Sequence, residues 1–236
     1  MSNVKYNKMP ELIPNELIER ISKLSPAQLC DGMKELGIFR EGCMDADILP
    51  IDEGKVMIGT AYTVDTQEGD NFPIHVAIYQ GKPGYVLVVA GKGYQEKAYI
   101  GDLMGAAADA IGLKGLVIDG FVRDKLGLKD LDIPIYARGL MQRGPGKKGP
   151  GEINTTVICG GVKVEPGDLI FGDCDGVTVV PRDRIEEVLE RAEQKNSYEE
   201  KRRELIAGYR RCLSEGKKLP DLAPGWVNEM LESLDL

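Results

Sequence analysis

The chain has 236 residues, of which 42% are hydrophobic and 29% are charged, and its formal net charge at pH 7 is −8. This length and apolar content are sufficient for one large globular domain with a substantial core. The acidic balance argues against a general nucleic-acid surface, which needs a basic excess to release counterions from phosphates. We therefore expect no direct nucleic-acid binding.

No targeting or membrane segment is evident. The first residues lack an apolar core of signal-peptide length, and no later segment approaches the roughly 20 apolar residues of a membrane-spanning helix. We therefore expect a cytoplasmic protein with no membrane partner. The cysteines are odd in number and lack CxxC spacing, which predicts reduced thiols with structural roles. They are Cys30, Cys43, Cys159, Cys174 and Cys212.

The first part of the chain predicts two helices. One opens at residues 14–16 and carries its apolar residues on a single face. Ser25 is a typical N-cap and Pro26 suits the first turn, so a second helix is predicted from there to a stop at Gly37.

A strand and a short third helix follow. Residues 56–64 predict the strand, and residues 74–78 predict a helix that contains His75. Because His75 is the only histidine, a multi-histidine zinc site is excluded. We interpret His75 as a structural residue rather than a base.

Residues 85–118 predict a βαβ unit. An apolar run at 85–89 predicts the first strand, and the helical spacing of apolar residues predicts a helix at 102–111 that ends at Gly112. The run at 116–118 predicts a second, parallel strand followed by a turn at Asp119-Gly120.

Five residues around this unit form the candidate site. In a βαβ unit, the strand C-termini and the helix N-terminus face one edge, where ligands bind. The free N–H groups of Gly101, Asp102 and Leu103 are therefore expected to meet Arg123 and Asp124 in one pocket. A helix N-terminus attracts an anion, arginine grips a carboxylate, and two aspartates recruit a metal.

The second half of the chain predicts strands and then a long helix. Residues 131–137 predict an edge strand because they contain Pro134. Short strands with turns between them predict a β-rich layer at 155–159, 162–164, 169–172 and 177–180. The charge-laced stretch 182–211 predicts a helix long enough to reach a neighbouring chain. The tail after it, which contains Trp226, predicts a short docked helix.

Two polar motifs have open or structural interpretations. Residues 143–152 are rich in glycine and proline and predict a loop, whose Arg143, Lys147 and Lys148 either bind the outer carboxylate of a substrate or are simply solvated. Asp173 and Asp175 are interpreted as turn residues, because the EF-hand pattern is absent. Gly91-Lys92-Gly93, after the predicted strand at 85–89, completes neither GxGxxG nor GxxxxGK[ST], so it provides no support for these nucleotide-binding loops.

Several stretches carry a family resemblance. They are GDLMGAAADAIGLKGLVIDGFVRD at 101–124, YARG at 136–139, RGPGKKGPGEIN at 143–154, GGVKVEPGD at 160–168 and GDCDGVTVVP at 172–181. Over roughly residues 15–210 the chain resembles the 4-hydroxy-4-methyl-2-oxoglutarate / 4-carboxy-4-hydroxy-2-oxoadipate aldolases. This family also contains the regulator of ribonuclease activity A. Members have been labelled demethylmenaquinone methyltransferases, a label for which these residues provide no physical support.

The resemblance implies an α/β fold, a swivelling β/β/α-type sandwich with a central β-rich layer flanked by helices and a long C-terminal helix. We expect a single domain over residues 1–236, with 213–236 as a C-terminal extension. The family's assembly implies a homotrimer or a homohexamer with sites between subunits.

The resemblance also implies roles for the candidate residues. Asp124 would ligate Mg²⁺ or Mn²⁺ directly, and Asp102 would hold it through water. Arg123, the Gly101 region and the Leu103 amide would bind the pyruvyl portion of a small 2-oxo acid.

A neighbouring subunit would complete the site with a carboxylate, for which Glu199 is the candidate and Glu200 the alternative. The implied activity is aldol cleavage of a 4-hydroxy-2-oxo di- or tricarboxylic acid to pyruvate and a second oxo acid. Oxaloacetate decarboxylation is expected through the same enolate. A divalent cation and a guanidinium stabilise that enolate, and a metal-bound or carboxylate-held water would be the base on the 4-hydroxyl.

Two positions depart from the family pattern. Gly127 stands where aldolase members usually carry Asp or Glu, and Ala90 stands where many members have Asp. Two alternatives therefore accompany the lyase prediction. One is a binding protein of the ribonuclease-regulator kind, and the other is a lyase for a different hydroxy-oxo acid.

Overall fold

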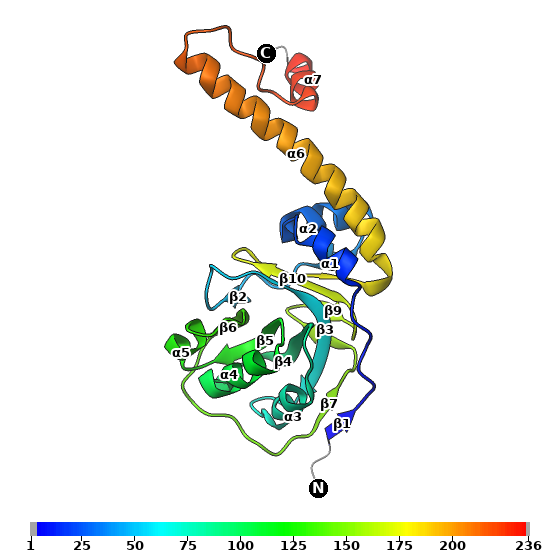
Figure 1. The fold of residues 1–236 in the computed structure, drawn as a ribbon, viewed down its shortest axis with the longest axis vertical. Coiled ribbons are helices and arrows are strands. Elements are labelled where there is room, and N and C mark those ends of the chain that lie inside the picture. Colours follow the sequence, from blue (N-terminus) through cyan, green and yellow to red (C-terminus); the bar gives the residue numbers. More distant parts are fainter. Residues whose placement is uncertain (1–3, 235–236) are drawn as a thin grey trace. The chain divides into compact units, whose positions relative to one another are not determined.

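The computed structural model describes residues 4–234. By packing, the chain divides into two compact units, one ending at Ala192 and one beginning at Glu193. In chain order the elements are β1 Val4–Tyr6, α1 Asn15–Ile21, α2 Pro26–Glu35, η1 Phe39–Gly42, β2 Leu49–Pro50, β3 Met57–Thr66, α3 Phe72–Gln80, β4 Tyr85–Ile100, α4 Asp102–Ile111, β5 Gly115–Val122, α5 Lys125–Lys129, β6 Ile135–Leu140, β7 Gly151–Ile153, β8 Val157–Cys159, β9 Val162–Val164, β10 Leu169–Asp173, β11 Gly176–Val180, η2 Arg182–Arg184, α6 Ile185–Ser214 and α7 Gly225–Ser233 (Figure 1).

A mixed sheet forms the centre of the first unit. Its strand order is β1-β7-β3-β4-β5-β6-β2, and β10 and β11 extend it from β3. The four strands β3, β4, β5 and β6 run parallel to one another, whereas β10 and β7 pair antiparallel with β3 and β2 pairs antiparallel with β6. Strands β8 and β9 form a separate antiparallel hairpin. The predicted βαβ unit is therefore confirmed as β4-α4-β5.

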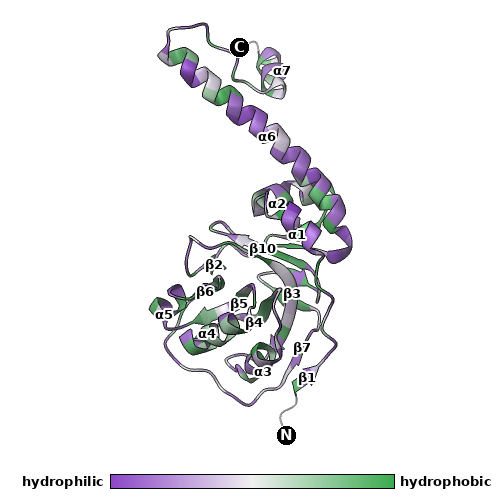
Figure 2. Cartoon of the chain, viewed as in Figure 1, coloured by the Kyte–Doolittle hydropathy of each residue, from purple (hydrophilic) through white to green (hydrophobic). Residues whose placement is uncertain are grey.

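Both faces of the sheet are buried. Because side chains alternate along a strand, Leu87 and Val89 of β4 face the helical side, in one core cluster with residues of α3, α4 and α5. Val86 and Val88 face the opposite side, in a second cluster with residues of β8 to β11. In Figure 2 the strands at the centre of this sheet carry much green, hydrophobic colour, with white and purple residues toward the sheet's edges. This arrangement confirms the predicted α/β class with a β-rich layer and flanking helices.

The N-terminal helices pack with the first part of α6. Leu29 and Met33 of α2 form a third buried cluster with Phe171 of β10 and Val188 of α6. The start of α2 follows from its sequence, because Ser25 and Gln28 form the reciprocal hydrogen bonds of a capping box. Pro26 occupies the first turn, as predicted.

The predicted turn at Asp119-Gly120 is wrong, because β5 continues to Val122. Asp119 is buried, and its carboxylate accepts hydrogen bonds from Arg138 Nε and from the Gly160 amide. A Cβ on residue 120 would lie 2.5 Å from the ring of Tyr99. Residue 120 is therefore a glycine because the Tyr99 ring leaves no room for a side chain. Asp119 is held by hydrogen bonds to residues that are distant in the sequence.

Two other strands also differ from the prediction. β4 runs to Ile100, and its register against β5 shifts beyond Val89, so that the strand bulges. The strand predicted at 131–137 starts at Ile135, and it is not at an edge because β5 and β2 flank it. Pro134 lies before this strand, where no ladder N–H is needed.

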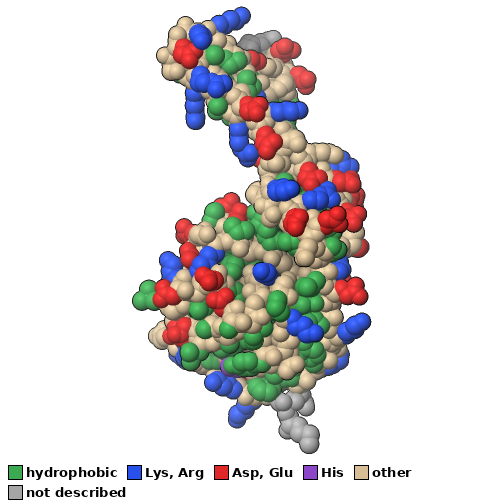
Figure 3. Space-filling model, viewed as in Figure 1, with side chains coloured by type: hydrophobic (Ala, Val, Ile, Leu, Met, Phe, Trp, Pro, Cys, Tyr) green, Lys and Arg blue, Asp and Glu red, His purple; other side chains and the backbone are tan. Residues whose placement is uncertain are grey.

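The second unit consists of the rest of α6 and of α7. The buried residues of α6 are Ile185, Val188, Leu189 and Ala192, which all belong to the first unit. Within the second unit, Arg202 Nη2 donates a hydrogen bond to the Leu222 carbonyl at 2.5 Å. Lysine, arginine and acidic side chains are interspersed over its surface (Figure 3).

The tail helix was predicted and is present as α7, where Trp226 is exposed. The prediction of one domain over residues 1–236 with an extension at 213–236 stays a prediction. Among the described residues, no helix combines the length and apolarity that crossing a membrane requires.

Candidate functional site

The five residues of the predicted pocket lie together. Gly101, Asp102, Leu103, Arg123 and Asp124 line one cavity of about 150 Å³ at the edge where β5 ends and α4 begins. The structure therefore brings these side chains into one place, whereas their roles as ligands stay predictions.

Backbone hydrogen bonds fix this juxtaposition. The Arg123 amide donates to the carbonyl of Ile100 at 3.0 Å, which ties the end of β5 to the residue before Gly101. The Gly101 carbonyl in turn accepts from Met104 and Gly105 and starts α4. The first turn of α4 is thus anchored directly beside Arg123.

Gly101 allows the carboxylate of Asp124 to lie close to the backbone of residue 101. A Cβ at this position would lie 2.4 Å from Oδ2 of Asp124 and 3.2 Å from Nε of Arg123. The backbone of Gly101 is extended, with φ −136° and ψ −172°. Glycine is therefore required here for space and not for backbone conformation.

Asp124 sits in a strained conformation. Its φ of 60° and ψ of 44° place it in the left-handed region, which costs conformational energy for any residue with a Cβ. Its Oδ2 lies 3.2 Å from Nε of Arg123, and both side chains are more than 40% exposed. An exposed pair of this kind contributes little stability.

Asp102 is the first residue of α4, where a carboxylate favourably meets the helix dipole. Its Oδ1 accepts a hydrogen bond of 2.8 Å from the Leu103 amide. Gly127 lies against it, because a Cβ there would be 2.7 Å from Cβ of Asp102. An acidic residue at 127 would therefore lie directly beside the Asp102 carboxylate, and in this chain that space holds no side chain.

Asp70 holds the glycine-rich loop over the pocket. Its Oδ1 accepts from the amides of Phe72 and Gly149, and its Oδ2 accepts from that of Lys148. Asp70 is only 7% exposed. The result is that Lys147 lines the pocket. Sequence reasoning missed Asp70, which precedes the loop by more than 70 residues and belongs to no motif.

Of the other two cations proposed for this loop, neither lines the pocket. Arg143 lies 3.8 Å from a carboxylate oxygen of Glu96. Lys148 contributes its backbone amide to Asp70. Of the three cations in the loop, only Lys147 therefore remains a candidate for binding a substrate carboxylate.

Asn71 was also missed. It precedes α3 at a position where asparagine usually caps a helix, but its side chain makes no cap hydrogen bond. Instead Nδ2 donates to the Tyr99 carbonyl at 2.9 Å, and Oδ1 is buried without a hydrogen-bond partner among the described residues. Because Asn71 lines the pocket, this oxygen is an orphaned acceptor at the candidate site.

His75 lines the same pocket, which its position in an apolar helix did not indicate. Burial, together with the nearby Lys147 charge, holds the pKa of His75 below its usual range. The imidazole is therefore neutral at pH 7, and it stacks against Tyr79 with ring centroids 6.2 Å apart.

Glu199 lies on the part of α6 that belongs to the second unit. Its Oε2 accepts a hydrogen bond from Nη2 of Arg203, one helical turn later, at 2.8 Å. Glu199 is predicted to serve a neighbouring subunit, and that role stays a prediction.

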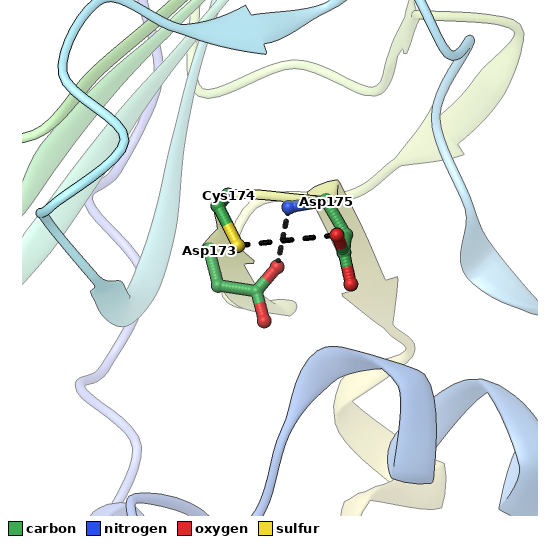
Figure 4. Close-up of side chains that lie close together, drawn as sticks. All are labelled: Asp173, Cys174 and Asp175. Atoms are coloured by element: carbon green, nitrogen blue, oxygen red, sulfur yellow. Dashed lines mark hydrogen bonds between the residues drawn. The ribbon is translucent and has the colours of Figure 1, made fainter.

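A second acidic group is explained without a ligand. Asp173, Cys174 and Asp175 lie close together in the turn between β10 and β11 (Figure 4). The Asp175 amide donates to Oδ1 of Asp173 at 2.9 Å, which is the side-chain-to-backbone bond of an Asx turn. The geometry agrees with the interpretation of these aspartates as turn residues.

Comparison with known proteins gives consistent matches. A family model described as "RraA-like: Aldolase/RraA" matches residues 26–179. The "Putative 4-hydroxy-4-methyl-2-oxoglutarate aldolase" of Halalkalibacterium halodurans is 40% identical over 164 residues, which are 70% of this chain and 78% of that protein. An uncharacterized protein of Methanocaldococcus jannaschii is 35% identical over 199 residues, 83% of this chain and 91% of the other.

A solved structure shares the fold. The crystal structure of Streptomyces coelicolor RraAS2, described as an unusual member of the RNase ES inhibitor RraA protein family, superposes with a TM-score of 0.73 at 27% identity. The match covers 80% of this chain and 98% of that one. Both an aldolase name and a ribonuclease-inhibitor name thus occur among the similar proteins.

The shifted pKa of His75 can be measured directly, because this is the only histidine. In an NMR titration we expect its midpoint to lie below the usual value of about 6.5. Lys147→Gln should raise the midpoint, since it removes a positive charge that disfavours the imidazolium. Lys148→Gln is the matched control and should leave it unchanged. Equal midpoints in all three proteins would contradict the placement of Lys147 beside His75.

Proposed function

The chain belongs to the RraA-like Aldolase/RraA family, and from this premise we propose that it is a divalent-metal-dependent carbon–carbon lyase that acts on small 2-oxo acids. The observation that carries the proposal is the convergence of Asp102, Arg123 and Asp124 at the N-terminus of α4 in one pocket. Two carboxylates, a guanidinium and the amides of a helix N-terminus are the groups that bind a chelated 2-oxo acid.

The pocket fits a hard divalent cation. Mg²⁺ and Mn²⁺ prefer oxygen ligands, and Mg²⁺ commonly uses one or two carboxylates with water and substrate as its other ligands. Asp124 and Asp102 are such donors, and the space at Gly101 admits the Asp124 carboxylate. We propose that Asp124 holds the cation directly and that Asp102 holds it through water. When bound, the cation would supply Lewis-acid polarisation of the 2-oxo acid.

The chain's own residues bind and orient the substrate. Arg123 can grip the carboxylate next to the keto group and stabilise the negative charge of the enolate left after cleavage. The Leu103 amide can donate to the same carboxylate once the Asp102 side chain, which now accepts from it, turns away. Lys147 is the proposed partner of an outer carboxylate. A pocket of about 150 Å³ suits a pyruvyl group rather than a drug-sized ligand.

The two expected reactions make different demands on the site. Aldol cleavage needs a base to take the proton from the 4-hydroxyl oxygen, and we propose a water held by a carboxylate for this step. Decarboxylation of oxaloacetate releases CO₂ and leaves the same enolate without such a base. Because Gly127 adds no carboxylate beside Asp102, we expect decarboxylation to be the more readily detected activity.

A carboxylate from a second copy is proposed to complete the site. The candidate is Glu199 on α6, with Glu200 as the alternative, in a homotrimer or homohexamer. The long helix supports this proposal, because α6 continues for 22 residues beyond Ala192 and has no buried residue there.

The second candidate function is a binding protein that acts on a partner without turnover. The likeness to RraAS2 favours this candidate. It predicts no pyruvate release from any 2-oxo acid, so one assay separates the two functions.

Removing the proposed metal ligand tests the lyase directly. Asp124→Ala should lower pyruvate release from oxaloacetate by a factor of about 100 or more, because a charge-stabilising group of the transition state is lost. Release by the unchanged protein should require Mg²⁺ or Mn²⁺ and stop with EDTA. Asp130→Ala, an exposed aspartate outside the pocket, is the control. Absence of metal-dependent release from both oxaloacetate and 4-carboxy-4-hydroxy-2-oxoadipate would reject the lyase and leave the binding function.

The space at Gly101 provides a second test. Gly101→Ala places a Cβ 2.4 Å from Oδ2 of Asp124 and must displace that carboxylate. We expect a loss of about 100-fold in activity, as for small misplacements of catalytic groups. Gly144→Ala is matched, because its Cβ would meet Nη1 of Arg123 at an ordinary 3.5 Å. Comparable activity in the two variants would show that the position of Asp124 is unimportant.

The shared carboxylate has its own test. Glu199→Gln should lower activity while sedimentation shows the same oligomer, because its ion pair with Arg203 is partly exposed and contributes only roughly 0.3–0.5 kcal/mol. Glu200→Gln is the comparison. If only Glu200→Gln lowers activity, the role belongs to Glu200, and if neither does, no shared carboxylate acts here.

A further inference from the structure

A second pocket lies away from the candidate active site. It has a volume of about 410 Å³ and shares no lining residue with the first. Its walls come from the start of α2, the segment after η1 and the turn between β10 and β11. Two of its lining residues are Cys30 and Cys43.

The two thiols of this pocket are in contact. Sγ of Cys30 lies 2.9 Å from Sγ of Cys43, and Oγ1 of Thr178 lies 3.3 Å from the Cys30 sulfur. Both cysteines are free and partly exposed. A disulfide bond is about 2.0 Å long, so a small change in the side-chain torsions would bring the sulfurs to bonding distance. Solvent and small molecules can reach the pair through the pocket.

The backbone around Cys43 is strained in a way that presents its sulfur to Cys30. Arg40 and Glu41 have φ values of 52° and 49°, and Gly42 follows with 69°. Three consecutive left-handed residues are costly, and such strain concentrates at functional sites. Glycine is required at 42, because a Cβ there would lie 2.1 Å from the Val179 carbonyl.

Packing on both sides holds the strained turn. Cys43 forms a β-bridge with Thr178, and the Met44 amide donates to the Val177 carbonyl at 3.0 Å. On the other side, Cys30 lies on α2 between the buried Leu29 and Met33. The two sulfurs are therefore kept together by well-packed elements and not by a mobile loop.

The charged and titratable groups around the thiols come from every wall of the pocket. They are Asp31 of α2, Arg40 and Glu41 of η1, Asp45 after η1, and Asp173 and Asp175 of the β10-β11 turn. The hydrogen bond with Cys30 lowers the pKa of Cys43 to about 7, an effect that Thr178 and Arg40 reinforce and that burial and Glu41 oppose. The same contact raises the pKa of Cys30. This direction favours Cys43 over Cys30 as the attacking thiolate of the pair.

We propose that Cys30 and Cys43 form a redox-active dithiol site that reacts with low-molecular-weight disulfides and closes to an intramolecular disulfide. In the first step the Cys43 thiolate attacks one sulfur of the oxidant RSSR, forms a mixed disulfide and releases RS⁻. In the second step Cys30 gives its proton to solvent, its sulfur attacks the Cys43 sulfur, and a second RS⁻ leaves. The protein loses two electrons and two protons, and the oxidant becomes two RSH.

The test uses the full chain and oxidised glutathione. After incubation and blocking of free thiols with an alkylating agent, trypsin should release the peptides 24–34 and 41–55 joined by a disulfide that a reductant opens. The rate of reaction should increase as the pH rises through about 7, because the thiolate is the attacking species. When the alkylation is carried out under denaturing conditions, which also expose the buried Cys159, three of the five thiols of each chain should be labelled and the two in the disulfide should not.

Variants separate this outcome from unspecific oxidation. Cys30→Ser should trap Cys43 as a stable glutathione adduct, because no second thiol can resolve it. Cys174→Ser, which changes an exposed cysteine, should keep the 24–34/41–55 link. Free Cys30 and Cys43 after incubation would overturn the proposal. A persistent glutathione adduct in the unchanged protein, or a link between chains or to Cys174, would overturn it as well. If a variant fails to fold, the peptide map of the unchanged protein still shows whether Cys30 and Cys43 become linked.

Discussion

The hydrogen bond from the Arg123 amide to the Ile100 carbonyl, 3.0 Å long, is the contact on which the candidate active site depends. It joins the end of β5 to Ile100, the last residue of β4 before Gly101 and α4, and so fixes where the helix amides stand relative to Arg123 and Asp124. Parallel pairing of β4 and β5 makes this contact possible, because both strands then end at the same edge of the sheet. The proposed lyase chemistry uses that edge. A guanidinium, two carboxylates and a helix N-terminus meet there over a small cavity.

Long-range packing stabilises what the local backbone disfavours. Asp124 is held in a left-handed conformation at the end of β5, and the glycine-rich loop is held over the pocket by the amides of Lys148 and Gly149, which donate to buried Asp70. Neither feature would persist in an isolated segment, because strained residues survive only where the surrounding structure determines them. The same reasoning applies to η1, whose consecutive left-handed residues bring Cys43 to Cys30. Both proposed sites therefore depend on strained backbone that the surrounding packing holds in place. They have no lining residue in common.

The second unit has a different character from the first. Beyond Ala192 α6 has no buried residue, and α7 leaves Trp226 exposed. Two helices with so small a core gain little stability by their own packing. A role in which Glu199 completes the site of another copy would make use of such a helix, and it would make assembly a part of the catalytic mechanism.

The sequence alone determined the βαβ unit, because helical and strand periodicities are local properties. It therefore placed α4 at 102–111 with Gly112 as its stop, and it predicted that Gly101, Asp102 and Leu103 would meet Arg123 and Asp124. Only the tertiary structure decided that β5 continues through Asp119, whose partners Arg138 and Gly160 are distant in sequence. Only the tertiary structure also showed that Asn71 and Asp70 lie at the pocket and that Cys30 contacts Cys43. A side chain whose partner is far along the chain leaves no periodic signal, so its role becomes visible only when the sheet and helices bring the two together.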